Sequence, residues 1–100
     1  MNARHKPGLV LSVHPTSRGF GWVLFEGPVT PVDWGLATVK AKRSARSLAR
    51  FERHLDRYKP KVVVFEQFEE RPARRYERIQ DLCHQMIRLA NERGIRTPIY

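Results

Sequence analysis

The sequence predicts a single α/β domain with a mixed sheet, in which an antiparallel three-stranded meander precedes two βαβ crossovers. Short apolar runs typical of strands occur at residues 9–13, 19–26, 32–40, 62–65 and 95–100. Apolar residues recur at helical spacing in the two long segments between the later strands. One hundred residues provide for one core, and no internal repeat divides the chain, so we expect one domain over residues 1–100.

The first three strands follow from apolar runs that are separated by turn residues. Residues 9–13 resemble a strand that is buried on both faces, and we expect a turn from His14 to Arg18. The second and third strands carry Trp22, Phe25 and Trp34, which strand patterns more often place in a core than on a base-stacking surface.

A helix is predicted over residues 44–58, because its apolar positions share one face at 100° per residue, about the α-helical period. Ser44 or Ser47 is the expected N-cap. The run over residues 62–65 is uninterrupted and ends at Glu66, which is typical of a central parallel strand. The apolar face of the helix comprises Leu48, Phe51, Leu55 and Tyr58.

The second predicted helix has Pro72 in its first turn and Gly94 at its C-cap, and a last strand begins after it. The lone Cys83 lies on its apolar face, so it reads as a core residue in a reducing compartment rather than as part of a disulfide or zinc site. The apolar face comprises Tyr76, Ile79, Leu82, Cys83, Met86 and Ala90.

The chain is strongly basic, with 19 Lys and Arg against 10 Asp and Glu, a net charge of +9 and a pI near 10.6. This charge favours a polyanionic partner, with nucleic acid first, over a surface that is basic only for solubility. We expect a flexible basic N-terminus at residues 1–8. The following apolar run is too short for a signal sequence or a membrane span, so we expect a cytoplasmic protein with no membrane partner.

Arginines recur every three or four residues along the first helix and gather again after the fourth strand. On the helix they form a stripe opposite the apolar face, which suits phosphate contact but also an ordinary solvated surface. The stripe comprises Arg43, Arg46, Arg50, Arg53 and Arg57. The second cluster, the better candidate for nucleic-acid contact, comprises Arg71, Arg74, Arg75 and Arg78, and Arg18 in the first turn is a further candidate.

Three segments resemble RuvC-type Holliday-junction resolvases, which have an RNase H-like fold. The turn from Val13 to Trp22 is similar to the family's Asp-Pro-Gly opening, and Asp33 to Leu36 is similar to its third strand. The segment from Val62 to Phe68 resembles its Ile-Glu-Gln motif. The resemblance implies a metal-dependent endonuclease that holds two Mg²⁺ or Mn²⁺ ions between carboxylates.

The resemblance makes Glu66 a candidate metal ligand and catalytic residue. It gives His14 the same candidate roles, because His14 stands where the family has its first aspartate. A neutral imidazole is a poor replacement for a carboxylate on magnesium, although zinc or manganese accepts it. The family's remaining carboxylates follow the fifth strand, in which this sequence ends, so we expect a truncated fold and impaired catalysis. A hydrogen-bonded turn residue is the plainer interpretation of His14.

Two other functions fit the same residues. In the first alternative, the chain is a non-catalytic module that docks on DNA, RNA or a protein, and one form of it is a homodimer that pairs through a helix. In the second alternative, the chain is a small basic RNA-binding protein. We favour DNA over RNA as the partner because of the resemblance.

Overall fold

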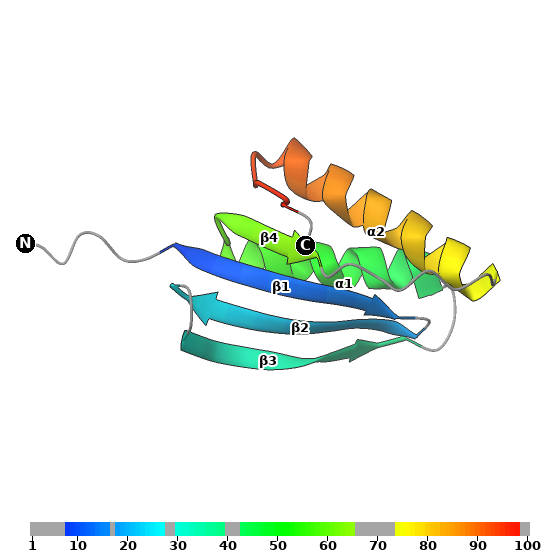
Figure 1. Ribbon diagram of the computed structural model, residues 1–100, viewed down its shortest axis with the longest axis horizontal. Helices are drawn as coiled ribbons and strands as arrows, with labels where there is room; N and C mark the ends of the chain where they lie inside the picture. The colour runs from blue at the N-terminus through cyan, green and yellow to red at the C-terminus, as the bar shows by residue number, and fades with distance from the viewer. Residues whose placement is uncertain (1–7, 17, 28–29, 40–42, 66–73, 99–100) are drawn as a thin grey trace, which may run out of the picture.

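The computed structural model describes residues 8–16, 18–27, 30–39, 43–65 and 74–98. These residues form four strands and two helices in an α/β arrangement (Figure 1). The strands are β1 (Leu9–Thr16), β2 (Gly19–Glu26), β3 (Thr30–Thr38) and β4 (Val62–Phe65), and the helices are α1 (Arg43–Tyr58) and α2 (Arg74–Glu92).

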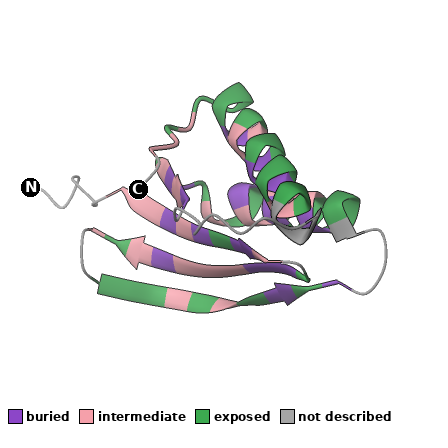
Figure 2. Cartoon of the chain, turned by 45° about the vertical axis from the view of Figure 1, so that its right-hand side comes forward, coloured by how far each residue is buried: buried purple, intermediate pink, exposed green. Residues whose placement is uncertain are grey.

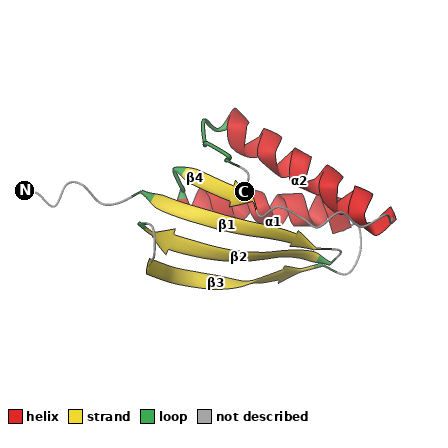
Figure 3. Cartoon of the chain, viewed as in Figure 1, coloured by secondary structure: helices red, strands yellow, loops and turns green. Residues whose placement is uncertain are grey.

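The four strands form one mixed sheet in the order β3-β2-β1-β4 (Figure 3). The predicted meander is confirmed, because β1 pairs with β2 and β2 with β3, both antiparallel. Strand β4 pairs in parallel with β1, so α1 makes a crossover connection from β3 to β4. The register sets Val13 beside Phe65 and His14 beside Gly21.

Several boundaries and neighbours differ from the sequence-based expectation. The ladder with β2 continues through Thr16, so His14 lies within β1 and not in a turn. Strand β4 was expected to be central, yet among the described residues only a single parallel bridge, between Val62 and Arg96, lies beyond it. A last strand over residues 95–100 is therefore present only as this bridge, and residues 99–100 lie outside the described part.

One face of the sheet carries the core, because side chains alternate between the two faces of a strand. Leu11, Val13, Val63 and Phe65 are fully buried and pack against both helices in one cluster. The alternate positions of β1 are only half-buried or exposed, so the expectation that this strand is buried on both faces was wrong. Figure 2 shows that buried residues recur along the strands and the helices, between partly buried and exposed ones.

Helix α1 forms as predicted, beginning one residue earlier, with Phe51 and Leu55 buried in the core. Its Ser47 is not a cap: it lies inside the helix, fully buried, and its Oγ is the one buried side-chain polar atom without a hydrogen-bond partner among the described residues. Phe51 meets Phe20 edge-on, with ring centroids 6.2 Å apart. These contacts hold α1 against β2.

Helix α2 packs on α1 and β1 through the expected apolar face, with Leu82, Cys83, Met86 and Ala90 buried. It ends as predicted at a left-handed glycine, Gly94, which has a φ of 76°. The Ile95 amide donates to the Ala90 carbonyl and the Gly94 amide to the Asn91 carbonyl, which closes the helix end. Neither helix, in the part of the chain described, is long and apolar enough to cross a membrane.

Candidate nucleic-acid interface

The resemblance placed a metal site where β1 and β4 end. Val13 pairs with Phe65, so the two strands run side by side up to the positions that precede His14 and Glu66 in the chain. His14 is exposed and lies on the face of the sheet away from the helices. Glu66 lies outside the described residues, as do Glu69 and Glu70.

The donors around His14 do not fit a magnesium site in the described part of the chain. His14 lines a shallow groove with Ser12, Val23 and Trp34, and the described residues that line it include no carboxylate. Nowhere among the described residues do three or more His, Cys, Asp or Glu side chains gather as metal ligands would. Mg²⁺ takes several oxygen ligands, and the described residues around His14 do not supply a set of them.

The stripe of arginines on α1 is exposed and faces the β3 side of the sheet. Arg46, Arg50 and Arg53 line a groove against Thr38 and Val39. Arg50 and Arg53 line a second groove with Arg57, His54, Tyr58, Trp22, Gly35 and Leu36. Among the described residues that line these two grooves, none is acidic. We call Arg46, Arg50, Arg53 and Arg57 the α1 arginine face; the Arg43 side chain lies outside the described ones.

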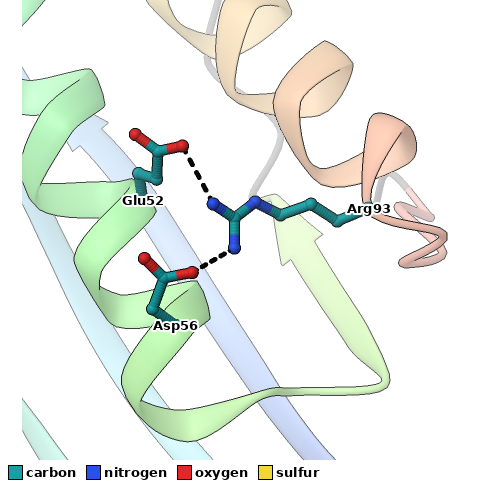
Figure 4. A network of polar contacts seen from close by, with 3 residues as sticks. All are labelled: Glu52, Asp56 and Arg93. Atoms are coloured by element: carbon teal, nitrogen blue, oxygen red, sulfur yellow. Dashed lines mark hydrogen bonds and ion pairs between the residues drawn. The ribbon is translucent and has the colours of Figure 1, made fainter.

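The acidic residues of α1 are engaged elsewhere. Arg93, which follows α2, donates to Glu52 over 2.9 Å and also pairs with Asp56 (Figure 4). Hydrogen bonds from Arg93 to Asp56 and then to Glu52 raise the pKa of its guanidinium, which stays charged. Both carboxylates therefore point toward Arg93 and not toward the α1 arginine face.

Aromatic side chains between α1 and the sheet line the second groove and contact one another. The His54 ring meets Trp22 at 4.6 Å between centroids and Tyr58 at 5.9 Å. The Tyr58 hydroxyl donates to Asp33 Oδ2 over 2.8 Å, and burial followed by this hydrogen bond raises the pKa of Tyr58. The guanidinium of Arg57 lies 5.2 Å from the Tyr58 ring, within the range of a cation–π contact.

Of the other predicted arginines, the structure describes the side chains of Arg18 and Arg78, and neither lines the two grooves. Arg18 is exposed between β1 and β2, and its backbone amide donates a hydrogen bond of 3.2 Å to the Thr16 hydroxyl. Arg78 is exposed on α2. Arg71 and the side chains of Arg74 and Arg75 lie outside the described ones, so the predicted second cluster stays a prediction.

The sequence-based reading missed the exposed apolar residues of β3. Trp34 is 65% exposed and Leu36 77% exposed, so the expectation that Trp34 lies in the core was wrong. Trp22 is partly buried against the core, as expected. A signal was present: small residues, Gly35 and Ala37, alternate with these large ones, and a helix packs closely on a strand face that carries small side chains.

Solved structures of Holliday junction resolvases have the same architecture. Thermus thermophilus RuvC in complex with a Holliday junction substrate superposes with a TM-score of 0.77 at 19% identity, over 93% of this chain and 64% of that one. The fold is RuvC-like. The fowlpox virus Holliday junction resolvase gives a TM-score of 0.64 at 15% identity, over 92% of this chain and 60% of its own.

The yeast mitochondrial Holliday junction resolvase gives a TM-score of 0.59 at 14% identity, over 97% of this chain and 53% of that one. This chain therefore spans less than two thirds of each of these RuvC-like structures. No protein-family model matches the sequence, and no curated protein matches it at a significant level. The predicted RuvC-like, RNase H-like fold is thus confirmed by the structural comparison, although the sequence identities are only 19% and 15%.

Proposed function

We propose that this chain is a nucleic-acid-binding domain whose α1 arginine face contacts phosphates. The observation that carries the proposal is a row of four exposed arginines along two grooves whose described lining residues include no acid. Arginine presents a planar fork of donors that suits phosphate oxygens. The net charge of +9 supports a polyanionic partner, and RuvC and the fowlpox resolvase were solved with Holliday junction DNA.

Binding of this kind depends on salt, because phosphate contacts release counterions from the nucleic acid. Each neutralised phosphate on duplex DNA contributes about −0.9 to the slope of log K against log salt. Four contacts would give a slope of about −3.6. We measure this by fluorescence anisotropy of a four-way junction, a DNA duplex and an RNA duplex between about 50 and 200 mM salt.

The test compares two double variants that remove the same charge. Arg50→Gln/Arg53→Gln changes the α1 arginine face, and Arg88→Gln/Arg96→Gln changes exposed arginines that line neither of the two grooves. We expect the first variant to make the duplex slope shallower by about 1.8 and the control to leave most of it. Equal losses in both variants would mean that α1 has no special part in binding. Tighter binding to RNA than to DNA would overturn the preference for DNA.

We further propose that phosphodiester cleavage is impaired in this chain. The support is that His14, with a neutral imidazole, stands where the resemblance implies a metal-binding carboxylate. We expect the wild-type chain and Glu66→Gln to leave a four-way junction equally intact in Mg²⁺ or Mn²⁺, and His14→Asp to bind Mg²⁺ more tightly. Junction cleavage that Glu66→Gln abolishes would instead make the chain a working metal-dependent endonuclease.

A further inference from the structure

Two grooves meet at the edge strand β3. One lies on the face of the sheet away from the helices, and the other lies between β3 and α1. Trp22, Gly35 and Leu36 line both grooves, so the two surfaces join across the middle of β3. Gly35 leaves this passage open: a Cβ there would come within 3.3 Å of the Trp22 indole.

The two sides of this passage have different chemistry. On the uncovered face, Trp34 and Leu36 present large apolar side chains at 65% and 77% exposure. On the helix side, Arg50, Arg53 and Arg57 line the groove. Contiguous exposed apolar surface beside charge is typical of a binding site, because water is a poor partner for an exposed indole and leucine.

Charge decides between the occupants of this surface. A second copy that paired β3 with β3 would bring two α1 arginine faces toward each other, and like charges at an interface oppose association. A polyanion would instead be complementary to them. The apolar side requires that the same partner also presents flat apolar surface, which the bases of a single strand do and the outside of a duplex does not.

We propose that the β3–α1 edge binds a single-stranded nucleic-acid segment, with phosphates on Arg50, Arg53 and Arg57 and a base on Trp34 beside Leu36. This inference rests on the proposed function and specifies the form of nucleic acid that the arginines serve. An aromatic platform next to a basic groove binds single strands with little sequence preference, because every base has a stacking face. Unpaired single strands arise where the base pairs of a branched duplex separate, so single-strand binding is compatible with binding of branched DNA.

The test measures binding of fluorescent oligothymidylate and oligouridylate of about 12 nucleotides, and of a duplex of the same length, by anisotropy. Trp34→Ala removes the stacking platform, and Val32→Ala is the matched control: Val32 is exposed on the same strand but lines neither groove. We expect Trp34→Ala to weaken single-strand binding about tenfold and duplex binding less than about twofold. Trp34→Phe should restore most of the affinity, and Val32→Ala should change neither.

The failures of this inference and of the proposed function can be told apart. If Trp34→Ala leaves single-strand binding unchanged, or weakens single strand and duplex equally, the single-strand site is overturned while phosphate binding stands. If no probe binds at any salt concentration, both the proposed function and this inference are wrong. If sedimentation finds a dimer that Trp34→Ala dissociates, the face is a contact between copies and the inference is wrong. A loss confined to the single strands, for either oligonucleotide, supports it.

Discussion

The two faces of the sheet are built by the same strands but meet different surroundings. Toward the helices, Leu11, Val13 and Phe65 are fully buried in one cluster with α1 and α2. Away from the helices, His14, Trp34 and Leu36 are exposed. Because neighbouring residues of one strand point to opposite faces, a single strand serves stability on one side and leaves the other side to contact a partner.

The comparison implies that changes on the covered face alter folding and that changes on the open face alter binding. Trp34 and Leu36 on the open face are already mostly exposed, so unfolding changes their exposure little and they contribute little to stability. The α1 arginine face lies beside the edge at which the two faces meet. We expect the following changes, from the largest effect to the smallest, to separate these roles.

Truncating a core aromatic should give the largest effect. Phe51→Ala, at a fully buried position, should lower the free energy of unfolding by about 3 to 5 kcal/mol, because it leaves a cavity. Trp34→Ala, on the open face, should change it by less than about 0.5 kcal/mol. Urea denaturation followed by circular dichroism measures both, and Phe51→Leu serves where Phe51→Ala does not fold. A large loss in Trp34→Ala would mean that the open face also stabilises the fold.

The buried thiol of α2 makes the covered face sensitive to alkaline pH. Burial raises the pKa of Cys83 from its ordinary value of 9.0 to about 11. The folded state therefore holds the thiol proton more tightly than the unfolded state, so stability is retained below pH 9 and lost as pH rises toward 11. Urea denaturation across this range measures the loss. Cys83→Ala should reduce the pH dependence, and Tyr58, whose pKa is also raised, accounts for what remains.

Two glycines on opposite faces should respond to alanine with opposite signs. Gly35 faces the helices, where a Cβ would lie 3.3 Å from the Trp22 indole, so Gly35→Ala should displace that ring and destabilise the fold. Gly21 faces away, where the nearest atom to a Cβ is Leu36 Cδ2 at 3.4 Å. Gly21→Ala should therefore be neutral or stabilise by about 0.5 kcal/mol, because alanine loses less entropy in a strand. Thermal unfolding distinguishes the two, and equal losses would contradict the assignment of faces.

The ion pairs of Arg93 should have the smallest effect, since they lie on the surface. Arg93→Gln should lower the thermal unfolding midpoint slightly at low salt, and the difference from wild type should vanish in high salt because screening weakens exposed pairs. It should also weaken phosphate binding, because Glu52 and Asp56 would no longer be neutralised. Unchanged binding would mean that these carboxylates do not influence the α1 arginine face.

Local pattern predicted the elements well, because strand and helix periodicities are set by residues close in sequence. Residues 62–65 were predicted as a strand and form β4, and the helix predicted from residue 44 to 58 is α1 within one residue. Pattern failed where pairing decides the outcome. His14 was assigned to a turn, yet its partner Gly21 keeps it in β1. Ser47, one of the two residues predicted as candidate N-caps, is instead buried within α1.

For the site, the sequence identified the arginines of α1 and their common stripe. This was possible because the helical repeat of about 3.6 residues per turn is a property of the backbone alone. Which way that stripe points is a tertiary fact: Phe51 and Leu55 dock on the sheet, and this docking turns Arg50 and Arg53 toward β3. The exposure of Trp34 and Leu36 was likewise decided by packing. Alternation marks two faces of a strand but does not say which face the helices cover, because that choice depends on contacts between residues far apart in the chain.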